Sequence, residues 1–223
     1  MIRSSTALAP LLLAAWLLAS CTGAPPEVVG VELSLEYVDN FDLDRRYEQL
    51  TLYALVRDQD GFADIRELYL IHDEAELYWH FDPDSWTHRR LAGENWIGFD
   101  GLTMADWSAL PRGRYRVVVI DASGEQDERA VALDAPPFSA VEHQLPQLDR
   151  AENSINVVGA PALLYVVSDD DVNGDHLSSP GHTVAPGEHA IAELLADQRS
   201  VSEGYLYVPL GSYYGSLSGP IRR

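Results

Sequence analysis

Residues Leu50–Gly61 read LTLYALVRDQDG, and this stretch decides the fold class that the sequence predicts. From Leu50 to Val56 an apolar residue recurs at every second position, which is the pattern of a β-strand that buries one face. Asp58–Gly61 then ends the strand, because Asp and Gly readily adopt the backbone conformations of tight turns. The stretch therefore predicts a strand followed directly by a turn.

The same alternation recurs on both sides of this stretch. Val31–Tyr37 places apolar residues at alternate positions between glutamates and a serine. Turn residues separate such runs about every ten residues, and no long amphipathic helix interrupts them, which is typical of a two-sheet sandwich. We therefore predict an all-β fold. Further strands are expected at residues 65–71, 77–81, 95–99, 115–120 and 129–133, with one helical turn at residues 103–107.

Two stretches resemble bacterial immunoglobulin-like and fibronectin-III-like domains. Leu52–Ile65 (LYALVRDQDGFADI) is similar to their B strand, acidic-glycine turn and C strand, and Pro111–Gly124 (PRGRYRVVVIDASG) is similar to their F strand and F–G turn. The resemblance covers residues 28–134 and implies an immunoglobulin-like β-sandwich there. It also implies that Tyr115 packs into a corner near the start of strand F, as a tyrosine often does in such domains.

The rest of the chain is predicted to form a smaller β-rich C-terminal module over residues 151–223. Residues 135–150 contain several prolines and no clear period, which indicates a linker or a strand-crossing connection. The module is interpreted either as a second small domain or as strands added to the first. Its expected strands are 154–158, 163–167, 189–194 and 205–208, and the glycines at 211, 215 and 219 are assigned to turns.

The N-terminal segment has the features of a lipoprotein signal peptide. A positive charge precedes Ala7–Ala19, an almost wholly apolar stretch that is shorter than the roughly 18–20 residues needed to span a bilayer. Leu18–Cys21 (LASC) resembles the lipobox of bacterial lipoproteins. The resemblance implies cleavage before Cys21 and lipid on its sulfur. Residues 1–20 are then the signal peptide, and residues 21–27 are a lipidated tether.

Lipid on Cys21 would make a membrane the first partner of the protein. Thr22 stands where an aspartate favours retention in the inner membrane, so the outer membrane is favoured. Cys21 is the only cysteine, which leaves a lipidated chain without a disulfide or a catalytic thiol. The formal net charge of −20 opposes binding to nucleic acid. We expect a bacterial cell-envelope protein whose other partner is an envelope protein or a glycan.

The loop Asp169–Asp175 (DDDVNGD) carries the sharpest pattern for a metal ion. Oxygen-bearing residues at alternate positions with a glycine resemble the first half of an EF-hand loop, and calcium takes six to eight oxygen ligands. The twelfth position is Pro180 instead of a glutamate, so an acidic surface turn is the alternative interpretation. No other cofactor is expected. The residues that would bind calcium are Asp169, Asp171, Asn173 and Asp175.

A second acidic turn lies at Asp58–Asp64. Because Asp and Gly satisfy local backbone amides in such turns, we interpret it as structural, without a metal. Three histidines near the C-terminal acidic loop offer zinc ligands, but their spacing matches no zinc motif. These histidines are His176, His182 and His189.

No catalytic motif is present in the sequence. Gly215–Gly219 (GSLSG) has leucine where a nucleophile elbow needs its serine, and there is no phosphate-binding loop or dinucleotide fingerprint. We therefore expect no enzyme, and a hydrolase that uses scattered carboxylates ranks last. The preferred function is a lipid-anchored envelope protein with a structural or binding role. A calcium- or carbohydrate-binding surface module is the alternative.

Aromatic residues concentrate between residues 69 and 107. We expect them to fill the sandwich core; exposed on one sheet face, they would instead form a platform for a carbohydrate or a protein. Tyr78 and Trp79 are neighbours on one predicted strand and must point to opposite faces. The cluster comprises Tyr69, Tyr78, Trp79, Phe81, Trp86, Trp96 and Trp107.

Overall fold

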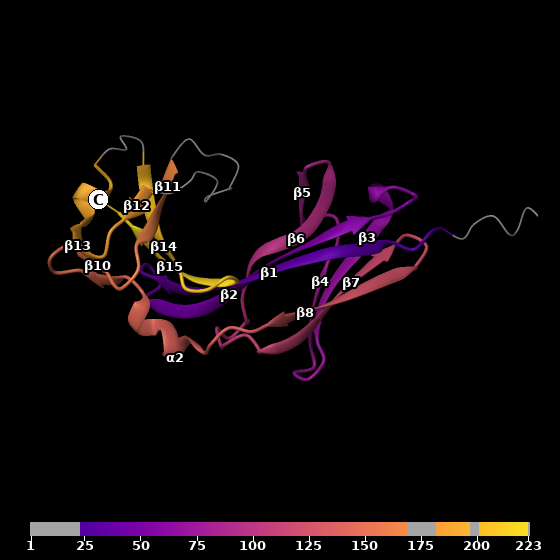
Figure 1. The fold of residues 1–223 in the computed structure, drawn as a ribbon, viewed down its shortest axis with the longest axis horizontal. Helices are drawn as coiled ribbons and strands as arrows, with labels where there is room; N and C mark the ends of the chain where they lie inside the picture. The colour runs from indigo at the N-terminus through magenta and orange to yellow at the C-terminus, as the bar shows by residue number, and fades with distance from the viewer. Residues whose placement is uncertain (1–22, 169–181, 197–200, 223) are drawn as a thin grey trace, which may run out of the picture. The chain divides into compact units, whose positions relative to one another are not determined.

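The structure is a computed structural model that describes residues 23–168, 182–196 and 201–222. Strands dominate these residues and form several sheets, whereas each helix is a single turn (Figure 1). The predicted all-β, sandwich-like fold is therefore confirmed. Among the described residues, no helix is both long enough and apolar enough to cross a membrane.

The sheets combine strands that are distant in the sequence. The largest sheet has the order β12 (His182–Val184), β11 (Ala162–Ser168), β14 (Val201–Pro209), β15 (Tyr214–Ile221), β1 (Glu27–Asn40), β2 (Arg45–Arg57), β6 (Glu94–Leu102) and β5 (Thr87–Leu91). A second sheet has the order β4 (Leu77–Phe81), β3 (Ile65–His72), β7 (Gly113–Asp121) and β8 (Gln126–Leu133). A third has the order β13 (Gly187–Ala190), β10 (Ser154–Val157) and β9 (Gln147–Asp149).

Contacts divide the chain into two compact units. Among the described residues, unit 1 contains those up to Val31, Ala54–Gly98 and Arg116–Ala130, and unit 2 contains Glu32–Tyr53, Phe99–Tyr115 and those from Val131 onward. Several long strands therefore contribute residues to both units. The predicted division into a sandwich at residues 28–134, a linker at 135–150 and a C-terminal module at 151–223 stays a prediction. The predicted linker holds α2 (Phe138–Val141), η2 (Glu142–Gln144) and β9.

Unit 1 has a core that is built from two sheets. On β3, Leu68 and Leu70 are fully buried while Tyr69 between them is half-buried, as the period of a strand requires. Burial of such apolar side chains contributes about 25 cal/mol per Å² of surface removed from water. The buried residues include Val56 and Ile97 from the largest sheet and Leu68, Leu70, Val117 and Val119 from the four-stranded sheet.

Unit 2 contains a parallel strand that the sequence pattern does not reveal. β15 pairs with β1 from Leu35 opposite Tyr214 to Asn40 opposite Gly219. The predicted turns at Gly215 and Gly219 are therefore wrong. An added Cβ at Gly215 would overlap the side chain of Tyr207, and one at Gly219 would overlap that of Tyr205. These glycines leave space for the tyrosine side chains of the neighbouring strand, whereas the sequence pattern predicted turns.

Two further predicted elements differ from the structure. The strand predicted at residues 189–194 ends at Ala190, and α3 (Ile191–Leu194) follows it. A helical turn places Ile191 and Leu195 on one side, and both are buried in the hydrophobic core of unit 2. Instead of the helical turn predicted at residues 103–107, the chain forms a hydrogen-bonded turn in which the Trp107 N–H donates to the Met104 carbonyl at 2.9 Å.

Tyr115 occupies the corner that the family resemblance implied for it. Its side chain is fully buried, and its hydroxyl donates a hydrogen bond to the Pro111 carbonyl at 2.7 Å. A tyrosine corner has this arrangement, with the hydroxyl bonded to the backbone a few residues upstream. Burial raises the pKa of the Tyr115 hydroxyl to about 12, because removal from water disfavours the charged phenolate.

Candidate functional site

Most residues that the sequence singled out for lipidation or metal binding lie outside the described residues. The expected lipidation site and the acidic loop both fall outside the described residues, so the lipid anchor and the loop's calcium site stay predictions. Of the C-terminal histidines, His182 is exposed, and half-buried His189 donates to the Ala185 carbonyl at 2.8 Å. The residues outside the described ranges are Cys21, Asp169, Asp171, Asn173, Asp175 and His176.

A different acidic cluster forms where two turns of unit 1 meet. Asp58 follows β2, Asp64 ends η1 (Phe62–Asp64), and Asp121 is the last residue of β7. Oxygen atoms of the three carboxylates lie within 4.8 Å of one another. Gly61 has a φ of 109°, which permits the bend between Asp58 and Asp64. The Ala122 N–H donates to the Asp64 carbonyl at 2.9 Å and joins the two turns.

Asp121 is the buried member of this cluster, with a side chain that is only 3% exposed. Its Oδ1 accepts hydrogen bonds from the Ser123 N–H at 2.8 Å, the Ser123 hydroxyl at 2.9 Å and the Glu125 N–H at 2.9 Å. Its Oδ2 is buried and has no hydrogen-bond partner among the described residues, and the same holds for Oδ2 of Asp58. One oxygen of Asp121 thus holds the turn that follows β7, whereas its other oxygen is unpaired among the described residues.

The sequence could have suggested this cluster only through strand pairing. Asp58 and Asp64 belong to the turn that we interpreted as structural, whereas Asp121 lies more than fifty residues later. β3 pairs with β7 so that Ile65 stands opposite Asp121. Antiparallel pairing therefore brings the residue before Ile65 next to the end of β7. Turn chemistry alone carries no information about this register.

The first described residues of the chain lie on the same turn. The Ala24 N–H donates to Asp60 Oδ2 at 2.7 Å. A Cβ added at Gly23 would lie 3.0 Å from Asp60 Oδ2 and 3.5 Å from Ser123 Oγ. The segment that follows Cys21 in sequence is therefore held against both turns that form the acidic cluster.

A second candidate site is the outer face of β3 and β4. Tyr69 stacks on His80 with ring centres 4.6 Å apart, and Tyr78 lies next to Tyr69 with ring centres 6.5 Å apart. Tyr78 is 69% exposed, the most exposed aromatic residue in unit 1 among those described. The Tyr69 hydroxyl donates to Glu67 at 2.5 Å, and this hydrogen bond raises the pKa of Tyr69. The four side chains form one surface, which we call the aromatic face.

The predicted opposition of Tyr78 and Trp79 is confirmed. Trp79 stands opposite Leu70, and Phe81 stands opposite Leu68, so both turn toward the buried side of the sheet. The interpretation of the whole aromatic group as core is therefore wrong for Tyr78, because alternation along β4 places it on the outside. The other members are half-buried except Trp107, which is 38% exposed.

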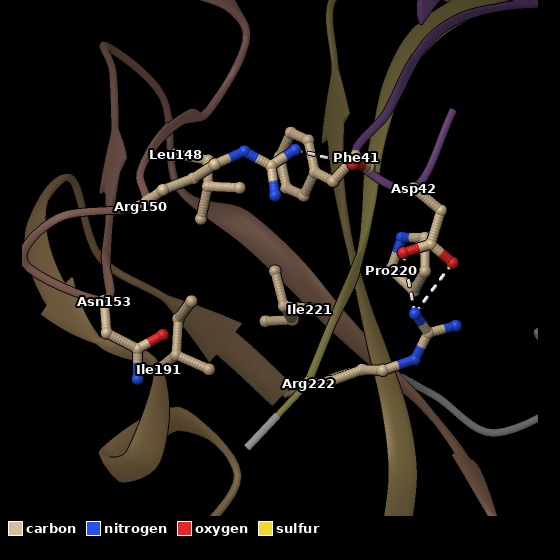
Figure 2. Close-up of a pocket in the computed structure, with 9 residues that line it drawn as sticks. All are labelled: Phe41, Asp42, Leu148, Arg150, Asn153, Ile191, Pro220, Ile221 and Arg222. Atoms are coloured by element: carbon tan, nitrogen blue, oxygen red, sulfur yellow. Dashed lines mark hydrogen bonds and ion pairs between the residues drawn. The ribbon is translucent and has the colours of Figure 1, made fainter. Parts of the chain in front are cut away.

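Unit 2 contains a pocket of about 250 Å³ (Figure 2). Its walls combine apolar side chains such as Phe41 and Ile221 with two arginines. The Arg150 guanidinium donates to the Phe41 carbonyl at 2.6 Å, whereas Arg222 binds both carboxylate oxygens of Asp42 at 2.6 and 2.7 Å. Arg222 also donates to Glu203 and lowers the pKa of that carboxyl. The guanidinium of Arg222 is therefore neutralised by the chain itself.

A more open pocket of about 510 Å³ adjoins the first and shares Leu148 and Arg150 with it. It contains the carboxylates of Asp149 and Glu188. Asp149 accepts hydrogen bonds from the backbone amides of residues 151 and 152, and Glu188 accepts one from the Ser154 hydroxyl at 2.8 Å. Both carboxylates hold local structure, which is a poor starting point for proton transfer to a substrate.

Glu48 is a second deeply buried carboxylate, and its charge is compensated. Its side chain is 2% exposed, and Arg112 donates to both of its oxygens at 2.7 and 2.8 Å. The Leu110 N–H adds a third bond at 2.9 Å. Arg112 also donates to the carbonyls of Ala135 and Pro136. This network joins β2 to two loops and has a structural role.

Comparison with known proteins does not assign a family. No protein-family model matches the sequence, and no curated protein gives a significant match. The functional inference therefore rests on the residues and on their geometry.

Proposed function

We propose that the protein is a lipid-anchored protein of the bacterial cell envelope, outer membrane favoured, which acts by binding an envelope glycan. The lipobox resemblance at Leu18–Cys21 supports the anchor. The tether of residues 21–27 leads directly into β1, which begins at Glu27. The sandwich is thus presented close to the membrane surface.

The observation that carries the binding role is the aromatic face. Tyr78 exposes an aromatic ring beside the stacked pair of Tyr69 and His80. Aromatic rings offer a large rigid contact area at a low cost in side-chain entropy, and sugar rings stack on them through their C–H faces. Glu67 lies next to the rings and can accept hydrogen bonds from sugar hydroxyls. The adjacent rings of Tyr69, Tyr78 and His80 support this proposal, since apolar residues exposed singly are normal on a protein surface.

The experiment separates the anchor from the binding face. The native chain should sediment with membranes and incorporate labelled palmitate, whereas Cys21→Ser should be soluble, unlabelled and equally stable. Soluble Cys21→Ser protein should then bind purified cell-wall glycan, and an added Tyr78→Ala substitution should weaken that binding about tenfold, the effect of losing one stacked ring worth about 1.4 kcal/mol.

Tyr213→Ala is the matched control, because Tyr213 is 74% exposed and lies in unit 2. It should leave glycan binding unchanged. Equal binding by the Tyr78→Ala and Tyr213→Ala proteins would contradict the assignment of the aromatic face. A native chain that takes up no palmitate would contradict the anchor.

A further inference from the structure

We propose that Asp58, Asp64 and Asp121 bind a calcium ion at the point where the tether enters the sandwich. The site is separate from the aromatic face and from the predicted calcium loop at residues 169–175. It replaces our interpretation of the turn at Asp58–Asp64 as purely structural.

The charge of the cluster is uncompensated within the chain. Oxygen atoms of the three carboxylates lie within 4.8 Å of one another, where like charges repel strongly at the low effective dielectric constant of a protein. No salt bridge between described residues includes Asp58, Asp64 or Asp121. Arg57, which precedes Asp58 in the sequence, pairs with Glu94 instead.

Buried oxygen atoms point independently to a ligand. Asp121 is only 3% exposed, yet its Oδ2 has no hydrogen-bond partner among the described residues. Asp58 Oδ2 is a second buried oxygen in the same condition. Buried polar atoms in folded proteins nearly always have a hydrogen-bond or metal partner, because an unpaired one loses its hydration without compensation. A cation beside these oxygens would supply the missing partner for both.

The donor set selects calcium among the common metal ions. All three side chains offer oxygen, and the cluster holds no histidine or cysteine of the kind that zinc prefers. The ligands come from two irregular turns, which suits the flexible coordination of calcium better than the strict octahedron of magnesium. Asp58 and Asp64 are only partly buried, so water can complete the coordination shell.

The position of the site gives it a consequence for the tether. Ala24 is bonded to Asp60, which lies between Asp58 and Asp64, and Gly23 packs against both Asp60 and Ser123. Ser123 in turn is bonded to Asp121. A bound ion would therefore fix the two turns that hold the first residues after the lipid anchor.

The test is a thermal melt of the full-length soluble Cys21→Ser chain, in chelator and with about 1 mM calcium or magnesium. Ligand that binds only the folded state raises the melting temperature by mass action. We expect a rise of several degrees with calcium, a smaller rise with magnesium, and, in a chain that also carries Asp171→Asn in the other predicted calcium loop, no calcium-dependent rise after Asp121→Asn. The Asn side chain keeps the Oδ1 acceptor that holds the turn, and Asp64→Asn serves as a second variant because no described hydrogen bond depends on its side chain.

Three controls make the result specific. Asp84→Asn removes one exposed negative charge of unit 1 and should keep the full calcium shift. Asp171→Asn alone alters the other predicted calcium loop, and the part of the shift that depends on Asp121 should persist in it. Tyr78→Ala should keep the shift whatever its effect on glycan binding, which separates this inference from the proposed function. No calcium shift in the parent chain, or a shift that survives both Asp121→Asn and Asp64→Asn, would overturn the proposal.

Discussion

Glu48 in unit 2 and Asp121 in unit 1 are both almost completely buried carboxylates, at 2% and 3% exposure. Arg112 and the Leu110 amide satisfy both oxygens of Glu48. Asp121 has one satisfied oxygen, one unpaired oxygen and two further carboxylates beside it. The chain itself supplies all the partners of Glu48, whereas Asp121 keeps one oxygen that a cation could bind.

The partners of a buried carboxylate therefore indicate whether it has a structural role or can bind a ligand. Removal of a carboxylate from water costs several kcal/mol, which must be offset by partners within the protein or by a ligand. A carboxylate with a complete set of partners has no capacity left for a ligand. A carboxylate keeps that capacity when one of its oxygens accepts hydrogen bonds from a turn and the other has no partner. The turn then also holds the free oxygen in a fixed position for binding.

The largest effect on the free energy of unfolding is expected at the buried pair of Glu48 and Arg112. Arg112→Met leaves Glu48 buried without its counter-charge, and loss of one partner of a buried pair costs about 3–5 kcal/mol of unfolding free energy. Urea denaturation measures this loss. Arg57→Met is the control, because its salt bridge with Glu94 is solvent-exposed and the loss of such a pair should change the unfolding free energy far less. Equal losses in the two variants would show that Glu48 does not need Arg112.

A smaller effect is expected at Tyr115. Tyr115→Phe removes one buried hydrogen bond and should cost about 1 kcal/mol at neutral pH. The folded-state pKa is raised to about 12, above the ordinary value near 10, so the parent chain is fully stabilised below pH 10 and loses that stability as the pH rises from about 10 to about 12.

Unfolding measured across this alkaline range checks the sign. Stability should fall less steeply in Tyr115→Phe than in the parent chain. Some slope should remain, because burial also raises the pKa of Tyr205 to about 12. An identical slope in both proteins would contradict a protonated Tyr115 in the corner.

Local patterns in the sequence predicted much of the fold. Alternation located β2, β3, β7 and β14, because a strand with one buried face shows its period directly. It missed β15, whose small residues carry no such period and are set by the tyrosines of β14. It also predicted that the strand from residue 189 continues to residue 194, where Ile191–Leu194 form a helical turn.

The candidate sites were harder to predict, since they depend on pairing between distant strands. Alternation along one strand places Tyr78 and Trp79 on opposite faces. The stacking of His80 on Tyr69, however, depends on the register between β3 and β4. Asp121 reaches Asp58 and Asp64 only through the pairing of β3 with β7. No spacing along the chain encodes these contacts.

The smallest expected effect gives the most direct test of the calcium site. It is the change in the free energy of unfolding of Asp121→Asn, measured in chelator and in millimolar calcium. The difference in unfolding free energy between the variant and the parent chain should change sign between the two buffers. In chelator the variant should match or exceed the stability of the parent chain, because one of three repelling charges is gone and the turn acceptor remains. In calcium the parent chain should be the more stable. A variant that is less stable than the parent by the same amount in both buffers would contradict the claim, because Asp121 would then be a structural residue like Glu48.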